Sequence, residues 1–263
     1  MNPIIRWAGS KRYLSKYLLP QFPLKVNRYI EPFCGSASLF FLLEPASAVL
    51  SDINSELINA LSLIRSRNNL VMDKYESLSD TSEIFYMVRG IDPKHLSKTE
   101  RAARFLYLNR LCFNGLYRTN SAGGFNVPYG GQRNSNLLTR AQIAAASKLL
   151  RRCDLRNDDF KKTIRNSMSG DFLYLDPPYA SKEHNEFRQY DANSFAISDI
   201  RDLWVELMNA DRRGVKFMLS YTKCEEMIPF CKKWGNTNVT VRRNIAGFAG
   251  YRKTASEVVI KNY

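Results

Sequence analysis

The stretch FLYLDPPYAS, residues 172–181, ends an apolar strand in an acid, two prolines and a tyrosine. Pro177 and Pro178 fix the backbone dihedral φ and lack N–H donors, so their carbonyl groups remain as acceptors that no neighbouring strand can pair. Asp176 adds a carboxylate, and Tyr179 adds a flat aromatic face. Because these groups accept hydrogen bonds and stack, they match a planar group with an NH₂ donor, such as the exocyclic amine of a nucleic-acid base.

A second candidate site follows an earlier strand. The strand YIEPFC (29–34) runs into the turn CGSAS, where Gly35 lets a ligand approach the backbone closely. The next apolar strand, AVLSD (48–52), ends at Asp52, where dinucleotide-binding folds place an acid that binds ribose hydroxyls. A plain tight turn and a solvated acid would leave the same residues in place. Together the two features indicate a site for an adenosine-containing cofactor of unspecified type.

These residues need a sheet and helices to position them. From residue 29 to about 66, the pattern predicts strand, glycine turn, helix, strand and helix. In the second helix Leu57, Leu61 and Ile64 recur at helical spacing, and we expect Ser55 to cap it. The alternation predicts an α/β protein.

The region from about 70 to 150 differs, because it is rich in helical patterns and basic residues. It predicts an amphipathic helix with Phe105, Leu108 and Cys112 on one side, followed by a long loop rich in Gly, Asn and Arg. Loops of more than about 12–15 residues are usually functional or disordered. Strands are then expected at 171–176 and 215–221, with NVTVRRNI and SEVVIKNY as a closing antiparallel pair. The simplest interpretation is an α/β sheet interrupted by an inserted helical region.

Composition narrows the class of partner. Lys and Arg number 39 against 25 Asp and Glu, which gives a formal net charge of +14 and a pI near 9.6. Such a surplus is typical of proteins that bind a polyanion such as nucleic acid, although a soluble protein can also be basic. The five cysteines are widely spaced without a CxxC pair, and there are two histidines. We therefore expect no disulfide framework and no metal centre. Because no apolar run is long enough for a signal peptide or a membrane helix, we expect a cytoplasmic protein without a membrane partner.

The order of the motifs resembles a known family. RWAGSK, EPFCGS, Asp52, the stretch LNRLCFNGLYRTNSAGGFNVPYG and DPPY are similar to motifs of the amino-group DNA methyltransferases that use S-adenosylmethionine. More narrowly, nearly the whole chain resembles the Dam-type adenine-N6 methyltransferases. The resemblance implies a Rossmann-like methyltransferase sheet formed by residues 1–55 and 159–263. It also implies an inserted helical DNA-recognition domain at residues 56–158.

The resemblance implies S-adenosyl-L-methionine as the cofactor. The residues that match the family's cofactor contacts are Trp7, Lys11, Phe33, Gly35, Asp52, Asp159, Phe160 and Asp176. Asp52 is expected at the ribose hydroxyls, and Asp159 and Phe160 are expected beside the adenine of the cofactor. Outside the motif, Trp7 would be interpreted as a core aromatic residue and Lys11 as a solvated charge.

The same resemblance implies catalytic roles for Asp176, Pro177 and Tyr179. Asp176, expected near the cofactor's methionine amino group, and the Pro177 carbonyl can accept both N6 hydrogens of adenine. The nitrogen lone pair is then directed at the sulfonium methyl. Positioning and electrostatics would carry most of the catalysis, and the reactive methyl belongs to the cofactor. Tyr179 would stack on the target base, which must be flipped out of the duplex to be reached. No metal is needed.

The resemblance also implies that double-stranded DNA is the partner. Positions that match the family's base contacts or supply polar groups beside them are Arg6, Phe113, Asn114, Leu116, Arg118, Asn120 and Pro128. Arg118 can bind O6 and N7 of guanine together. The motif suggests GATC or a related site that begins with GA. Further arginines are phosphate-contact candidates or parts of a solvated face, namely Arg133, Arg140, Arg151 and Arg152.

Two alternatives remain, of which the first belongs to another class of function and the second keeps the enzyme class but changes the acceptor. One is a sequence-specific DNA-binding protein that has lost catalysis. The other is an amino-methyltransferase that acts on cytosine N4, on RNA or on a protein amide. By resemblance, Asp rather than Ser or Asn at position 176 favours adenine over cytosine and amide acceptors. We expect the protein to be bound to DNA in the cytoplasm of a bacterial or phage-infected cell. Restriction-associated relatives share much of the same recognition motif.

Overall fold

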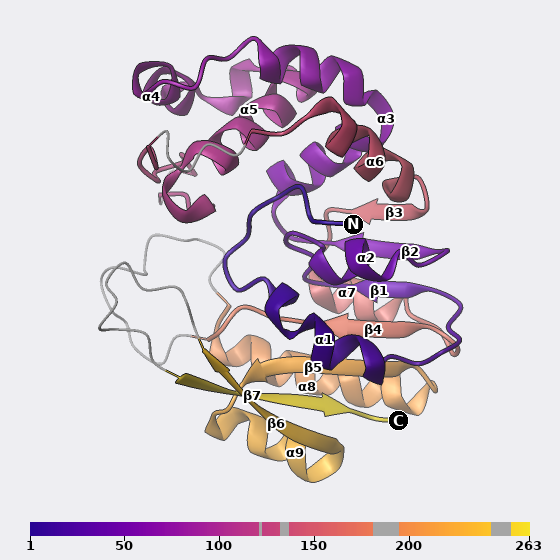
Figure 1. Cartoon of the computed structure of the whole chain (residues 1–263). Coiled ribbons are helices and arrows are strands. Elements are labelled where there is room, and N and C mark those ends of the chain that lie inside the picture. The colour runs from indigo at the N-terminus through magenta and orange to yellow at the C-terminus, as the bar shows by residue number, and fades with distance from the viewer. Residues whose placement is uncertain (121–122, 132–136, 181–194, 243–253) are drawn as a thin grey trace.

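The computed structural model describes residues 1–120, 123–131, 137–180, 195–242 and 254–263. Within these ranges, seven strands form one sheet in the order β3-β2-β1-β4-β5-β7-β6 (Figure 1). The strands are β1 (Tyr29–Glu31), β2 (Ala48–Ser51), β3 (Cys153–Arg156), β4 (Phe172–Leu175), β5 (Lys216–Thr222), β6 (Gly235–Arg242) and β7 (Thr254–Lys261). The first five pair in parallel, whereas β7 is antiparallel to both β5 and β6. The predicted α/β sheet and its closing antiparallel pair are therefore confirmed.

Helices cover both faces of this sheet. Their bounds are α1 (Ser15–Leu18), α2 (Ser38–Leu43), α3 (Ser55–Glu76), α4 (Ser82–Gly90), α5 (Lys98–Leu111), α6 (Arg140–Leu150), α7 (Phe160–Arg165), α8 (Ile197–Arg212) and α9 (Ile228–Lys233). Figure 1 shows α1 and α2 in front of the strands, with α7 and α8 behind them. Because side chains alternate along a strand, Tyr29 and Ile30 of β1 belong to the two different cores.

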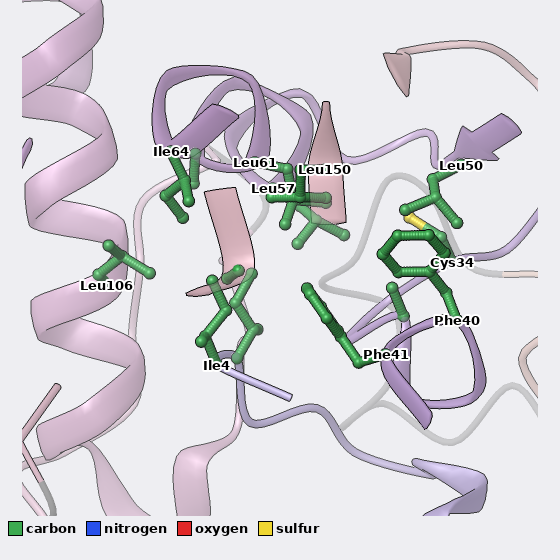
Figure 2. Close-up of a cluster of buried hydrophobic side chains, with 14 of the residues drawn as sticks. Ile4, Cys34, Phe40, Phe41, Leu50, Leu57, Leu61, Ile64, Leu106 and Leu150 are labelled. Carbon is green, nitrogen blue, oxygen red and sulfur yellow. The ribbon is translucent and has the colours of Figure 1, made fainter. Parts of the chain in front are cut away.

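Helices α3, α4, α5 and α6 gather beyond β3 (Figure 1). This helical region shares one hydrophobic core with the front face of the sheet. Figure 2 shows how the core joins them, with labelled side chains from the N-terminal segment, the turn after β1, α2, β2, α3, α5 and α6: Ile4, Cys34, Phe40, Phe41, Leu50, Leu57, Leu61, Ile64, Leu106 and Leu150. The continuous core fixes these helices against the side of the sheet that ends at β3.

Strand β3 was not expected from the sequence. It lies inside the 56–158 segment, yet it pairs with β2 through the register Ala48↔Cys153 to Ser51↔Arg156. The division of the chain at residue 158 stays a prediction, but the sheet begins again before that point.

Three local expectations need correction. Asn54 rather than Ser55 caps α3, because the Asn54 side chain accepts a hydrogen bond from the Leu57 N–H at 3.0 Å. The first strand ends at Glu31 rather than at residue 34, since Pro32 has no N–H to continue the ladder. Helix α5 is buried on nearly all sides rather than amphipathic, because it packs against both α3 and α4.

Candidate active site

The strand order reverses at β1 and β4, which are neighbours in the sheet. The turns that follow these strands therefore meet outside one edge of the sheet, where open α/β folds bind ligands. A cleft of about 1530 Å³ opens there. Most small-molecule pockets enclose about 300–1,000 Å³, so this cleft has room for more than one ligand. It is lined by every residue predicted for the cofactor and for catalysis: Trp7, Lys11, Phe33, Gly35, Asp52, Asp159, Phe160, Asp176, Pro177 and Tyr179.

Asp176 follows β4 and forms an ion pair with Lys11. The Lys11 Nζ lies 3.2 Å from Asp176 Oδ1, and the lysine side chain is almost fully buried, whereas Asp176 is one-fifth exposed at 21%. Burial raises the pKa of the Asp176 carboxyl to about 6, although the charge of Lys11 opposes the rise. The carboxyl is therefore ionised at neutral pH and can accept hydrogen bonds at the cleft.

Tyr179 is held at its hydroxyl and at its ring. The hydroxyl accepts a hydrogen bond from Lys11 Nζ at 3.0 Å and donates one to Glu257 Oε1 at 3.1 Å. The ring meets the Tyr221 ring edge to face, with centroids 5.4 Å apart. These contacts fix the plane of an aromatic ring that lines the cleft, as a stacking role requires.

The two proline carbonyls behave differently. The Pro178 carbonyl accepts a hydrogen bond from the Tyr221 hydroxyl at 3.4 Å, and the same hydroxyl accepts one from the Ala180 N–H at 2.7 Å. Among the described residues, none donates to the Pro177 carbonyl. The expectation that neither carbonyl is bonded by a neighbouring strand is wrong for Pro178, because a side chain of β5 bonds it, and it stays a prediction for Pro177. Tyr221, which the sequence did not indicate, bonds the Pro178 carbonyl, so within the described residues Pro177 is the one of the two that stays available as an acceptor.

A frame of three phenylalanines lines another part of the cleft. The Phe33 and Phe160 rings are stacked with centroids 5.1 Å apart, and Phe195 lies within 5.9 Å of both. Asp159 caps α7 by accepting a hydrogen bond from the Lys161 N–H at 2.8 Å, which fixes Phe160 at the first position of that helix. Phe195 was missed, since nothing in its local sequence links it to the other two rings. The frame offers apolar faces to a planar group.

Asp52 ends β2 beside the glycine turn. Its two carboxylate oxygens accept hydrogen bonds from the N–H groups of Gly35 and Asn54, each at 3.0 Å. Burial raises the pKa of Asp52, and these backbone bonds oppose the rise. A carboxylate has about four acceptor positions, so Asp52 keeps capacity for hydroxyl groups in the cleft.

Gly35 is needed for a reason that differs from the expected one. Its φ is +45°, and a Cβ there would lie 2.6 Å from Cδ1 of Trp7. The close neighbour of the backbone is therefore the Trp7 indole, where we expected a ligand. The indole in turn stacks on Tyr117 with centroids 5.7 Å apart. Trp7 thus connects the glycine turn to the loop that follows α5.

We call residues 112–120 and 123–130 the recognition loop. The Phe113 N–H donates to the Pro128 carbonyl at 2.9 Å, which joins the two ends of the loop. Arg118 Nε donates to Asn126 Oδ1 at 2.9 Å, and Asn120 Oδ1 accepts from the Gly124 N–H at 2.8 Å. Asn120 therefore stabilises a turn through its side-chain oxygen, which was the alternative to a base contact. Its side-chain NH₂ group can still donate a hydrogen bond to a base.

The predicted DNA contacts fall into two groups. Arg118 and Asn120 line the cleft. The others do not line it, namely Arg6, Phe113, Asn114, Leu116 and Pro128. Phe113, Asn114 and Pro128 are exposed and Leu116 is half-buried, while the Arg6 guanidinium donates to the Arg110 carbonyl at 3.0 Å.

The phosphate-contact candidates also differ from one another. Arg140 forms ion pairs with Asp73 and Glu76, so its charge is largely compensated. Arg151 and Arg152 are exposed. Arg133 lies outside the described residues. Arg151 and Arg152 are therefore the better candidates for a phosphate.

The sequence also missed two buried acids at the site. Glu31 Oε1 accepts hydrogen bonds from the Tyr29 hydroxyl at 2.6 Å and from the Phe40 N–H in α2 at 3.1 Å. Burial raises the pKa of Glu31 to about 8. Glu257 in β7 is fully buried and bonds Lys11, Tyr13 and Tyr179. An acid within a run of otherwise buried strand residues was the signal that could have identified Glu257.

Neither a metal centre nor a membrane span was found in the part of the chain that the structure describes. No group of three or more His, Cys, Asp or Glu side chains there is arranged to hold a metal ion. None of the described helices combines the length and hydrophobicity that a membrane span needs.

Comparisons with known proteins agree with the motif order. The model of the family described as D12 class N6 adenine-specific DNA methyltransferase matches residues 7–245. The chain is 32% identical to the Type II methyltransferase M1.LlaDCHI of Lactococcus lactis subsp. cremoris, over 100% of this chain and 96% of that protein. It is 33% identical to a DNA adenine methylase of Serratia marcescens, over 76% of this chain and 75% of the relative. It is 26% identical to the DNA adenine methylase of Escherichia coli K12, over 97% and 93% respectively.

Proposed function

Because the chain belongs to the family of D12 class N6 adenine-specific DNA methyltransferases, we propose that its methyl donor is S-adenosyl-L-methionine and its acceptor an adenine in duplex DNA. Methylation of adenine at N6 in DNA is the reaction of this family. The family therefore favours adenine over cytosine N4, RNA or a protein amide as the acceptor. We further propose that the adenine lies in GATC or in a related site that begins with GA.

One arrangement carries the proposal. An ionised carboxylate at Asp176, the available Pro177 carbonyl and the fixed ring of Tyr179 all line one cleft at the carboxyl end of β4. The two oxygens can accept the two N6 hydrogens, which draws the amine away from planarity and directs its lone pair. The ring of Tyr179 stacks on the base. Preorganised acceptors of this kind lower the barrier by positioning and electrostatics.

Further residues that line the cleft fit the proposed donor. The apolar faces of Phe33, Phe160 and Phe195 suit its adenine, and the remaining acceptor positions of Asp52 suit its ribose hydroxyls. The carboxylate of Asp176 suits a positively charged amino group. When bound, the donor supplies a methyl group activated by a sulfonium. The volume of about 1530 Å³ exceeds what one such ligand needs, which leaves space for a base flipped out of the duplex.

The recognition loop supports the DNA part of the proposal. Arg118 is exposed at the cleft and can read a guanine through its guanidinium, while Nε remains bonded to Asn126. The net charge of +14 favours a polyanionic partner and predicts that binding weakens steeply with salt.

The test is methyl transfer by the purified full chain. Donor labelled in its methyl group is mixed with a duplex that contains GATC, with the same duplex carrying N6-methyladenine at that site, and with duplexes that scramble GATC. We expect label on adenine N6 in the first duplex and none in the second. Sequencing of modified bases then gives the site. Absence of methyl on adenine in any duplex would refute the donor and acceptor, whereas methylation outside GA would refute only the proposed site.

A further inference from the structure

Glu257 is a buried acid in β7 that reaches the catalytic residues from the antiparallel half of the sheet. Its side chain is fully buried. Oε1 accepts hydrogen bonds from Lys11 Nζ at 3.1 Å, from the Tyr13 hydroxyl at 2.9 Å and from the Tyr179 hydroxyl at 3.1 Å. Oε2 accepts one from Ser220 Oγ at 3.2 Å. An isolated buried charge is strongly unfavourable, so a carboxylate with this many donors is a built feature of the fold.

Lys11 connects Glu257 to the acceptor of the reaction. Its ammonium has three N–H donors. Three acceptors lie within hydrogen-bonding distance of Nζ: Asp176 Oδ1 at 3.2 Å, Glu257 Oε1 at 3.1 Å and the Tyr179 hydroxyl at 3.0 Å. The donors and acceptors therefore match in number. Glu257 binds Lys11 and Tyr179 at once, so its position determines where both side chains stand relative to Asp176.

The charges of the cluster do not cancel. One ammonium at Lys11 faces two carboxyl groups, Asp176 and Glu257. A purely structural ion pair needs only one of them. Because Lys11 also interacts with Glu257, it neutralises the negative charge of Asp176 only in part. Asp176 is then a stronger hydrogen-bond acceptor than it would be in an ion pair with Lys11 alone. The titratable groups that interact with Asp176 come from the N-terminal segment, β1, β4, the DPPY turn and β7, namely Lys11, Glu31, Tyr174, Tyr179 and Glu257.

We propose that Glu257 is a positioning residue for methyl transfer, which holds Lys11 and Tyr179 and preserves Asp176 as the acceptor for the amine. This inference rests on the proposed function. Glu257 does not line the cleft, so it acts through its neighbours. The negative charge of Glu257 contributes to the raised pKa of Asp176, which lies at about 6. Protonation of Asp176 removes an acceptor, so the transfer rate of the wild type falls as the pH drops through about 6.

The test is Glu257→Gln, which keeps the shape of the side chain and removes its charge. We expect kcat for DNA methylation to fall by about 10- to 100-fold, the range seen when outer partners of metal ligands are removed. KM for the donor and for DNA stays close to that of the wild type. Without the Glu257 charge the pKa of Asp176 drops, so the acid limb of the kcat profile moves to lower pH.

The chain offers a matched control at the other end of β4. Asp171 is buried and accepts hydrogen bonds from Arg28 Nε at 3.0 Å and from the Met168 N–H at 2.9 Å. Asp171→Asn also removes a buried carboxylate bonded to a cation, but away from the cleft. We expect this variant to have a lower Tm, with the acid limb and kcat of the wild type. A merely structural role of Glu257 predicts the same behaviour for Glu257→Gln.

The outcomes separate the inference from the function on which it rests. An inactive wild type refutes the proposed function. An active wild type with a folded Glu257→Gln whose kcat and acid limb are unchanged overturns the role of Glu257. If Glu257→Gln does not fold, Glu257→Asp is tested in its place. This variant keeps the negative charge, but its shorter side chain holds the carboxylate farther from Lys11. For that variant we expect reduced kcat with an unchanged acid limb, and a change confined to KM would overturn the inference.

Discussion

Side chains are positioned in opposite ways in the recognition loop and at the carboxyl ends of the parallel strands, where Lys11, Asp176 and Glu257 meet. We call the latter region the sheet edge. At the sheet edge, Lys11 and Glu257 bond each other across 246 residues of sequence, and both are buried. In the recognition loop, Arg118 bonds Asn126 across 8 residues, and the contact is exposed. The edge is built from long-range contacts in the core, while the loop is built from local contacts on the surface.

On the proposed function, the difference follows from what each region would bind. Transfer of a methyl group needs charges and acceptors that are fixed before the substrate arrives, and burial among distant elements provides this. Reading DNA needs donors that remain free to meet a partner outside the protein, so they stand on a loop held by a rigid scaffold. The comparison therefore predicts that changes at the edge affect the rate, and that changes in the loop affect the choice of site.

The largest effect is expected for Asp176→Ala. Removing this carboxylate leaves Lys11 without one of its partners and, on the proposed mechanism, the adenine amine without its acceptor. The rate of methyl transfer should fall on the order of 10²–10³-fold or more. DNA affinity should remain close to that of the wild type, because Asp176 belongs to the sheet edge. Single-turnover transfer and DNA binding, measured on the same preparation, check both parts.

A near-normal rate in Asp176→Ala would remove the acceptor role from this residue. A loss of DNA affinity equal to the loss of rate would show that the sheet edge and the recognition loop do not have separate functions. Asp171→Ala, at the other end of the same strand, controls for the loss of a buried acid.

Arg118→Ala probes the loop in the same way. A bidentate contact with guanine contributes about 1–3 kcal/mol of discrimination, so preference for the cognate site should fall by roughly 5- to 150-fold. The rate on a saturating cognate duplex should change much less. Arg140→Ala removes an equal charge that is already paired with Asp73 and Glu76, and its site preference should match the wild type. Unchanged preference in Arg118→Ala would disprove the reading role.

The sequence was informative where function depends on local chemistry. The prolines of the DPPY turn stop β4, and the acid beside them lies at the end of the strand for the same reason, so both were predictable. Gly35 was also predictable as a constrained turn, but its neighbour Trp7 was not. The local sequence indicates that there is little space beside the backbone at Gly35, but it does not indicate which group occupies that space.

Residues brought in by tertiary contacts were not predictable. Phe195 lines the cleft, and Glu257 and Tyr221 contact Tyr179, which also lines it. No local motif links these three residues to Asp176 or Phe33. Strand β3 was missed because CDLR is short and carries two charges in four residues. Its pairing with β2, which decides that it is a strand, is a contact between distant segments.

The last and smallest effect concerns Arg6 and Trp7, where the two regions meet. Trp7 lies against Gly35 at the sheet edge, and Arg6 lies against Gly115 in the recognition loop, where a Cβ would be 2.5 Å from the Arg6 Cβ. Both glycines have positive φ, +45° and +63°. Alanine at either position would carry backbone strain of about 1–2 kcal/mol, and its Cβ would also force Trp7 or Arg6 to move. We expect Gly35→Ala to weaken donor binding and Gly115→Ala to weaken DNA binding, each measured by titration.

Two other glycines separate the close contact from backbone strain. Gly9 and Gly123 have φ of +79° and +81°, and a Cβ at either would meet nothing within 4 Å. Gly9→Ala and Gly123→Ala therefore carry the strain without the contact, and each should weaken binding less than its partner in the same region. If Gly35→Ala and Gly115→Ala each weakened both ligands equally, Arg6 and Trp7 would transmit the change across the boundary. Because these neighbours share one stretch of backbone, that result would make the edge and the loop a single coupled unit.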